Sequence, residues 1–405
     1  MENFLKDVFQ IESSDRDEAF KFVADAASNT AVVEAGKDMF TFLAMPHSAE
    51  NIPAAPAGKR VMYCLSERYL KEFDEGGKLH FATIDDNVYP SEIWEEMEQT
   101  TGLVAIVNGI PYLVSEIAIP TMTMRASVSG EMTVHSHTFI RNLHICEGFF
   151  LNNANDCKVR MVYRSAMHNG VEVRKAFAFL GSQYSYIPQT VLNDAVETLE
   201  KEDSLGKPVF KGMAMDHDFT REVVEYPEAA EDIAEAVKKT GADITPFVSV
   251  TTSDIGWSSV LVRGGYRTGK GSKVTVSEIK IQHKGNVTAE DILAKADEQI
   301  FTPVRKFPEQ LVELMGKKAA NTRAVAVLLG KTKKACFKSF TKRQMETLED
   351  IKESLNPALT YTGYDIAMMF IDGEQRFNDG ASETAKADFE AALAKVPAYL
   401  LKEMP

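Results

Sequence analysis

The residues Gly330-Lys331-Thr332 follow an apolar run, which is the arrangement that precedes the phosphates in a nucleotide-binding loop. Such a loop wraps the phosphates with backbone amides, so it requires a further glycine five residues before Gly330. The residue at that position is Val325. We therefore expect no nucleoside triphosphate site here, and the lysines of this stretch need another explanation.

Potential zinc ligands are concentrated in the stretch HSHTFIRNLHIC, since imidazole and thiolate both bind zinc well. However, His-x-His in a strand points both rings to one face, whereas structural zinc sites combine two closely spaced ligand pairs. The favoured interpretation is a partly exposed strand with one core histidine. A metal-dependent enzyme that uses His135, His137 and His144 is the alternative.

The triplet Asp216-His217-Asp218 could bind a metal or transfer protons, but no nucleophile motif accompanies it. A polar loop between two elements explains it equally well. The sequence contains no GxSxG, HExxH or dinucleotide-type GxGxxG motif. We therefore predict no catalytic residues and no cofactor, and we favour a protein that is not an enzyme.

Basic residues are concentrated in three segments of a chain whose formal net charge is −14. Basic side chains attract phosphates through counterion release, and aromatic faces stack on unpaired bases. These segments are therefore predicted to bind nucleic acid. The candidate residues are Arg160, Arg164, Arg174 and Lys175 in the first segment, Arg263, Tyr266, Arg267, Lys270 and Lys273 in the second, and Lys331, Lys333, Lys334, Phe337, Lys338, Lys342 and Arg343 in the third.

Each basic segment also has a purely structural explanation. Phe337 and Phe340 are three residues apart, so they could belong to a core while the lysines face water. Acidic residues dominate 193–204 and 225–236, and the basic tract could contact such carboxylates on a neighbouring copy of the chain. Self-association is therefore the alternative to nucleic-acid binding.

Length and composition indicate an ordinary globular protein of one large domain or two to three smaller ones. No stretch approaches the length of an apolar membrane span, and the N-terminus lacks the basic start and apolar run of a secretion signal. We expect a cytoplasmic protein that does not cross a membrane. Its four widely spaced cysteines are expected to be free thiols.

Three parts of the sequence have strand signals. The segment 158–180 has arms rich in Val, Tyr and Phe around His168-Asn169-Gly170, which predicts a β-hairpin. A second pair of strands is expected around Asn108-Gly109, although Pro111 weakens the prediction of a two-residue turn. The segment 245–285 predicts three or four strands, with GGYRTGKGS as a flexible glycine-rich connection.

Helical spacing of apolar residues occurs in 1–30, in 188–202 and in 228–241, and the last of these ends in a glycine. Beyond Thr288 the chain is expected to be almost wholly helical. That part opens with a capping box formed by Thr288 and Asp291.

The order of these elements predicts an α+β fold. We expect antiparallel hairpins and a central mixed or antiparallel sheet flanked by helices, followed by a mainly helical C-terminal part. The predicted regions are an N-terminal α+β region (1–100), a β-rich central domain with inserted helices (101–287) and a helical C-terminal region (288–405).

Three stretches carry a resemblance to a known family: RKAFAFLGSQYSYIPQTVLNDAVETL (174–199), PFVSVTTSDIGWSSVLVRGGYRT (246–268) and TYTGYDIAMMFIDGEQRF (360–377). Over roughly residues 170–400 the chain resembles the phage/plasmid-like proteins of domain-of-unknown-function family 932. The resemblance implies no catalytic residues. It implies a mobile-element setting, a bacterial host cytoplasm and a role around DNA.

Taken together, the basic segments and the resemblance predict a non-enzymatic nucleic-acid-binding protein encoded by a bacteriophage or plasmid. It would act on single-stranded DNA in replication or recombination, as a homo-oligomer. The alternative is a self-associating virion or assembly protein. A metal-dependent enzyme and an inhibitor of host defence rank below both.

Overall fold

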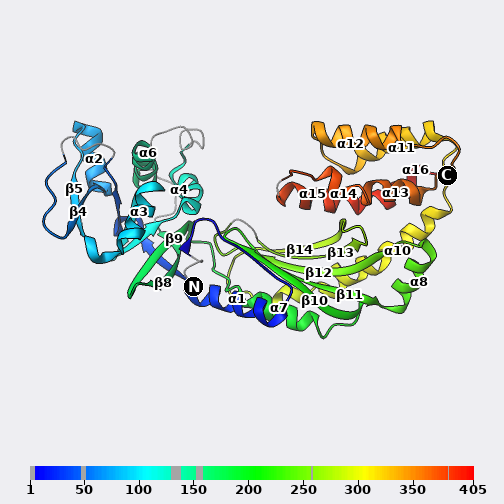
Figure 1. The fold of residues 1–405 in the computed structure, drawn as a ribbon, viewed down its shortest axis with the longest axis horizontal. Helices are drawn as coiled ribbons and strands as arrows, with labels where there is room; N and C mark the ends of the chain where they lie inside the picture. Colours follow the sequence, from blue (N-terminus) through cyan, green and yellow to red (C-terminus); the bar gives the residue numbers. More distant parts are fainter. Residues whose placement is uncertain (1–4, 47–51, 129–137, 152–157, 257–258, 382) are drawn as a thin grey trace.

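The computed structural model describes residues 5–405 except 47–51, 129–137, 152–157, 257–258 and 382. It contains an eight-stranded sheet and a six-stranded sheet, each packed against helices, and ends in a group of helices (Figure 1). This confirms the predicted α+β fold. The strands are divided between two sheets, whereas the sequence predicted one central sheet.

The eight-stranded sheet and its helices form the N-terminal lobe. Its strand order is β2-β8-β9-β7-β6-β3-β4-β5, antiparallel except for the β7–β9 pair. Helices α2, α4 and α6 pack on one face, and α3 packs on the other. The bounds are β2 Thr30–Gly36, β3 Phe40–Ala44, β4 Lys59–Leu65, β5 Phe81–Asp85, β6 Leu103–Val107, β7 Ile110–Val114, β8 Lys158–His168, β9 Val171–Gly181, α2 Glu67–Gly76, α3 Ser91–Gln99, α4 Ile119–Ala126 and α6 Thr138–Leu151.

Both predicted hairpins are present in this lobe. Strands β8 and β9 are joined by Asn169 and Gly170, which have φ angles of 48° and 81°. Strands β6 and β7 are joined in the same way by Asn108 and Gly109. Pro111 is tolerated because β7 pairs with β9 only at Leu113 and Val114, so the missing amide lies outside that ladder.

The six-stranded sheet and the remaining helices form the C-terminal lobe. All its strand pairs are antiparallel, in the order β1-β10-β11-β12-β13-β14. The bounds of the strands are β1 Gln10–Ser13, β10 Gly206–Asp216, β11 Thr220–Ala229, β12 Ile244–Thr252, β13 Val260–Thr268 and β14 Lys273–Ile281. The segment 245–285 thus forms three strands, at the lower end of the prediction.

Helices cover the two faces of this sheet differently. On one face the side chains of Val224, Val248 and Val262 form a core with α7 and α10. On the other face α15 lies against β14, and Figure 1 shows α13–α15 above this edge of the sheet with α11–α12 beyond them. The bounds are α1 Arg16–Asn29, α7 Thr190–Leu199, α8 Glu231–Thr240, α9 Ala289–Leu293, α10 Thr302–Met315, α11 Thr322–Cys336, α12 Lys342–Glu353, α13 Gly363–Ile371, α14 Glu374–Phe377, α15 Glu383–Leu393 and α16 Lys395–Glu403.

The helix signals in 188–202 and 228–241 are confirmed, whereas the range 1–30 contains the strand β1 before α1 begins at Arg16. Helices α7 and α8 lie where helical spacing predicted them, and Gly241 ends α8 in the left-handed conformation. The capping box of Thr288 and Asp291 opens α9. From Ala289 onward the described residues form helices and the turns between them, apart from an isolated β-bridge between Lys318 and Thr362.

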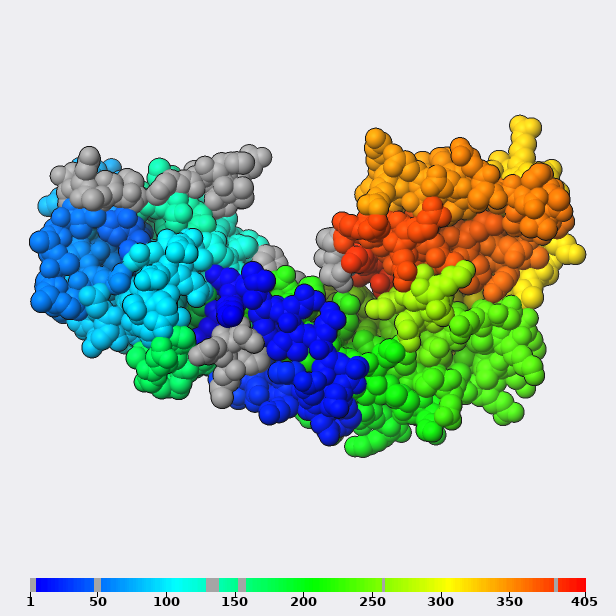
Figure 2. Space-filling model, viewed as in Figure 1, coloured from blue at the N-terminus to red at the C-terminus, as the bar shows by residue number. Residues whose placement is uncertain are grey.

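The predicted boundary at residue 100 falls inside a single structural unit. Strands from both sides of this residue form the eight-stranded sheet, while β1, near the N-terminus, pairs with β10 of the other sheet. The first two predicted regions are therefore interleaved in space. Figure 2 shows that the molecule is hollowed between the N-terminal lobe and the C-terminal helices.

The glycine-rich stretch GGYRTGKGS is not a flexible connection along its whole length. Gly264 and Gly265 lie within β13, and only 269–272 connect β13 to β14. A Cβ atom at Gly265 would lie 1.9 Å from the carbonyl oxygen of Val274, and one at Gly264 would lie 2.4 Å from the Ile300 side chain. These glycines therefore allow close packing of the strand.

We expect Gly265→Ala to lower the free energy of unfolding by roughly 2–3 kcal/mol, because the neighbouring backbone must move to admit the methyl group. The matched control is Gly330→Ala in α11, where a Cβ meets nothing within 4 Å. That change should stabilise the protein by about 0.5–1 kcal/mol through helix propensity. Urea unfolding measures both, and equal effects at the two sites would contradict the packing argument.

Candidate nucleic-acid interface

The three basic segments do not form one surface. The β8–β9 hairpin belongs to the N-terminal lobe, β13 and β14 belong to the six-stranded sheet, and 331–343 spans the end of α11 and the start of α12 (Figure 1). Each segment is therefore assessed by itself.

The first segment contributes two buried cations rather than a basic surface. Arg164 is 1% exposed, with its Nη2 atom 2.9 Å from Asp254 Oδ2 and its Nη1 atom 2.7 Å from His217 Nδ1. Lys175 is buried opposite Arg164 in the β8–β9 ladder, and its Nζ atom lies 3.0 Å from Asp7 Oδ1. The prediction that Arg164 and Lys175 contact nucleic acid is wrong for this structure, because neither side chain reaches solvent.

The other two cations of this segment, Arg160 and Arg174, form ion pairs with neighbours. Arg160 contacts Glu34 on the adjacent β2 at 2.8 Å, and Arg174 pairs with Glu172 two residues away on β9. These contacts are typical of the solvated face of a sheet, so the hairpin carries no concentrated positive charge.

The third segment contains core phenylalanines, as its structural explanation proposed. Phe337 is buried, with ring centroids 5.6 Å from Phe370 and 4.8 Å from Phe389. Phe337 is therefore unavailable for base stacking, and Lys333 lies over the ring of the partly buried Phe340 at 5.5 Å. Gly330-Lys331-Thr332 lies inside α11, so this stretch is a helix and not a phosphate-binding loop.

The remaining cations of the third segment are exposed. Lys331 lies 3.5 Å from Glu403, Lys342 lies 3.9 Å from Glu346, and Arg343 pairs with Asp379. Lys334 and Lys338 are exposed beside them. The end of α11 and the start of α12 therefore carry exposed cations, three of which lie beside carboxylates.

The second segment divides between the two faces of the six-stranded sheet. Tyr266 points into the core and donates a hydrogen bond to the carbonyl of Val304 at 2.9 Å, so it cannot stack on a base. Lys270 lies in the β13–β14 turn and pairs with Asp372 at 2.6 Å. Arg263, Arg267 and Lys273 lie on the opposite face from Tyr266.

Arg263, Arg267 and Lys273 line a cavity beside α15, together with cations that were not candidates in the sequence. A groove of about 800 Å³ lies over β1, β10 and β11, with Lys211 and Arg221 on its surface. This groove adjoins the smaller cavity beside α15, because Arg221 and Lys273 line both of them. We call the combined feature the sheet groove. Its basic residues are Lys211, Arg221, Arg263, Arg267, Lys273 and Lys386.

Acidic residues neutralise part of this charge. Arg267 donates two hydrogen bonds to Glu225, of 2.6 and 2.7 Å, and Arg263 contacts Glu278 at 2.6 Å. The other carboxylate of the cavity is Glu390 on α15, which accepts a 3.3 Å hydrogen bond from Thr275 Oγ1. Arg221, Lys273 and Lys386 line the same cavity as Glu390.

Lys211, Arg221 and Lys386 were not candidates in the sequence because each lies outside the three clustered basic segments. Strand periodicity was the available signal, since Arg221, Val223 and Glu225 alternate with the core residues Glu222, Val224 and Tyr226. The pairing of β11 with β12, and the position of α15 over β14, could not be read from the sequence.

The candidate metal ligands are not assembled in the described structure. His135 and His137 lie outside the described residues. His144 and Cys146 lie on α6, so the expected strand is wrong here; His144 is 3.3 Å from Glu147 and Cys146 is in the core. Within the described ranges no three His, Cys, Asp or Glu side chains are grouped to hold a metal ion.

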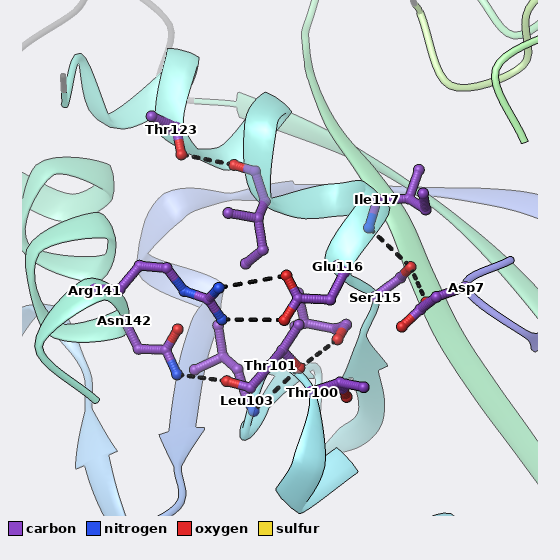
Figure 3. Close-up of polar contacts among 12 residues, drawn as sticks. Asp7, Thr100, Thr101, Leu103, Ser115, Glu116, Ile117, Thr123, Arg141 and Asn142 are labelled. Carbon is purple, nitrogen blue, oxygen red and sulfur yellow. Dashed lines mark hydrogen bonds and ion pairs between the residues drawn. The ribbon is translucent and has the colours of Figure 1, made fainter. Parts of the chain in front are cut away.

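Neighbouring polar residues instead position α6, as Figure 3 shows. Arg141 reaches both carboxylate oxygens of Glu116 at 3.3 Å, and Asn142 donates a 2.7 Å hydrogen bond to the carbonyl of Thr101. The side chain of Ser115 bonds Asp7, the partner of Lys175, which ties the N-terminal segment to the same region.

The triplet Asp216-His217-Asp218 forms a turn, as the polar-loop interpretation predicted, but its histidine is buried. Asp216 Oδ1 accepts hydrogen bonds from the amides of Asp218 and Phe219 between β10 and β11. Burial, and then the charge of Arg164, lower the pKa of His217 to about 4, so the ring is neutral at physiological pH. With Arg164 and Asp254, His217 forms what we call the junction cluster, which joins β8 to the six-stranded sheet.

The cysteines that the structure describes are unpaired and buried. Cys64, Cys146 and Cys336 are free, and burial raises the pKa of the Cys64 and Cys336 thiols to about 11. Cys157 lies outside the described residues. Thiols with such a raised pKa are poor nucleophiles, so these cysteines do not indicate catalysis.

Comparison with protein-family models, with curated proteins and with solved structures finds no match for this chain. In the part of the chain that is described, none of the helices combines the length and the apolar character that crossing a bilayer requires.

Proposed function

We propose that this chain is a non-enzymatic nucleic-acid-binding protein of a bacteriophage or plasmid, which holds the backbone of a single strand in the sheet groove. The observation that carries this proposal is the convergence of Arg221, Arg263, Lys273 and Lys386, from three strands and a helix, on one hollow. Sequence-independent binding needs this kind of charge along a concave surface.

The remaining lining of the groove fits a nucleic-acid backbone. Phe219 is half-buried at its rim and offers an aromatic face to a base. Gln10, Ser13 and Ser14 supply neutral hydrogen-bonding groups on the β1 side. The resemblance to phage/plasmid-like proteins supports a mobile-element setting, a host-cytoplasmic location and a role in replication or recombination.

We expect the double variant Arg221→Gln/Lys273→Gln to weaken binding to a fluorescent oligothymidylate, because both cations lie where the two hollows meet. The slope of log affinity against log salt concentration should decrease by about 1.4, which is about 0.7 for each phosphate contact removed from a single strand. Fluorescence anisotropy over a range of salt concentrations measures this.

The matched control is Lys334→Gln/Lys338→Gln, which removes two exposed cations from the α11–α12 surface. It should leave the affinity unchanged. A loss confined to this control would move the interface to α11 and α12. Wild-type protein that binds no oligonucleotide, or binds independently of salt, would rule out the proposed function.

Self-association as a virion or assembly protein is the second candidate, and the α11 surface favours it. Val327 is 53% exposed and lies on the same helical face as Lys331 and Lys334. An apolar side chain beside cations suits an acidic surface on a second copy. Light scattering at several salt concentrations tests this, and a strict monomer throughout would exclude it.

A further inference from the structure

A cavity of about 100 Å³ lies in the N-terminal lobe, between α3 and the face of the eight-stranded sheet that this helix covers. Its apolar wall includes four buried residues of a single core, Leu5, Met97, Leu113 and Val173. Protein interiors are normally packed without voids larger than a water molecule. A space of this size within a core therefore suits a small ligand with an apolar body.

The polar part of the cavity wall is an ammonium group held between two carboxylates. Lys175 borders the cavity and is 5% exposed, with its Nζ atom 3.0 Å from Asp7 Oδ1 and 3.1 Å from Glu96 Oε1. Ser115 donates a hydrogen bond to the same oxygen of Asp7, which holds this carboxylate in place (Figure 3). An ammonium group has three N–H donors and a carboxylate about four acceptor sites, so Lys175 and Glu96 both retain hydrogen-bonding capacity.

The charges around the cavity select against a charged ligand. A ligand carboxylate would lie beside Asp7 and Glu96, and a ligand ammonium would lie beside Lys175. Either ion would also lose its hydration in a mostly apolar space. A hydroxyl group has neither cost, because its oxygen can accept a hydrogen bond from Lys175 while its proton is donated to Glu96.

We propose that this cavity binds a small neutral alcohol, with the hydroxyl group between Lys175 and Glu96 and the hydrocarbon part against Leu113 and Val173. The cavity is smaller than the roughly 150 Å³ space that accepts benzene in another protein, so the ligand is a short aliphatic chain of about four carbons. The site lies in a different lobe from the sheet groove and does not depend on the proposed function.

The test compares 1-butanol with butyrate and butylammonium, which are ions of similar chain length, in ligand-observed NMR titrations of the full chain. The alcohol should bind roughly tenfold more tightly than either ion, because each ion must be desolvated beside a like charge.

Two leucine variants locate the binding site. Thr100→Leu places a larger apolar side chain in the cavity wall and should weaken 1-butanol binding at least about tenfold. The matched control is Thr198→Leu on α7, outside the cavity, because Thr100 and Thr198 each donate a 2.9 Å hydrogen bond to the carbonyl four residues earlier. This control should bind 1-butanol as wild type does.

Four results would overturn the assignment. They are no binding of 1-butanol to wild type, binding of either ion as tight as that of the alcohol, binding that survives Thr100→Leu, and an equal loss in both leucine variants. The last two would place the contact outside the cavity. None of these results bears on the proposed function, which is tested separately by oligonucleotide binding.

Discussion

Asp254→Ala is expected to lower the free energy of unfolding by about 3–5 kcal/mol, the largest effect that we predict for a single substitution. Asp254 and Arg164 are each 1% exposed and lie 2.9 Å apart. Removing the carboxylate leaves the guanidinium buried beside His217, whose lowered pKa keeps the ring neutral. Chemical denaturation at neutral pH measures the loss.

Two further variants test whether the loss of stability comes from leaving a charge buried without its partner. Asp232→Ala removes the exposed partner of Arg305, at a comparable 2.8 Å distance, and should cost less than about 1 kcal/mol. The double variant Arg164→Met/Asp254→Leu replaces the buried ions with apolar groups and should recover much of the stability. If Asp254→Ala costs no more than Asp232→Ala, the junction cluster does not hold the two sheets together as we infer.

Glu222→Gln is expected to stabilise the protein by about 3 kcal/mol at pH 7. Glu222 is fully buried on β11, and neither of its carboxylate oxygens has a hydrogen-bond partner among the described residues. Burial raises the pKa of Glu222 from 4.5 to about 8, since Arg16 nearby is committed to Glu200. At pH 7 the folded protein must therefore bind a proton that the unfolded chain does not hold, and the substitution removes this cost.

The contribution of Glu222 to the free energy of unfolding should decrease as the pH rises. The folded-state pKa of Glu222 lies above its unfolded value, so the folded protein holds the extra proton between pH 4.5 and about 8. Wild-type stability attributable to this group is therefore complete below 4.5 and declines as the pH rises towards 8. Urea unfolding across this range should show the decline in wild type and its absence in Glu222→Gln.

Glu225→Gln is the matched control on the same strand. Glu225 faces the sheet groove and accepts two hydrogen bonds from Arg267, so its neutralisation should destabilise the protein, opposite in sign to Glu222→Gln. A stabilising effect at both positions would indicate general charge repulsion in an acidic chain rather than the burial of Glu222.

Turns and helix ends were predictable because their causes are local. Asn108-Gly109 and Asn169-Gly170 adopt positive φ angles that few other residue pairs accept, and these pairs set both hairpins. The caps at Thr288 and Gly241 depend on side chains and conformations within one turn of the helix. The residues from Thr138 onward, which form α6, were mistaken for a strand because the preceding His-x-His pattern was given more weight than their helical spacing.

The site was only partly predictable, because a cation looks the same in the sequence whether it is buried or exposed. Arg164 and Lys175 were grouped with surface arginines, yet their partners Asp254 and Asp7 are distant in sequence and convert them into buried ion pairs. Arg263, Arg267 and Lys273 were grouped because they are close in the sequence, and the antiparallel pair β13–β14 places them on one face of the sheet.

By itself, the sequence determined the local elements, the α+β class and the absence of a phosphate-binding loop at Gly330. Each depends on residue types within a few positions of one another. Only the tertiary structure decided which strands share a sheet, which cations are buried, and that α15 borders the same cavity as cations of β11, β13 and β14. These outcomes depend on contacts between residues that are distant in the sequence, such as Arg164 and Asp254, which are 90 positions apart. Burial and charge pairing between such residues leave no local pattern in the chain.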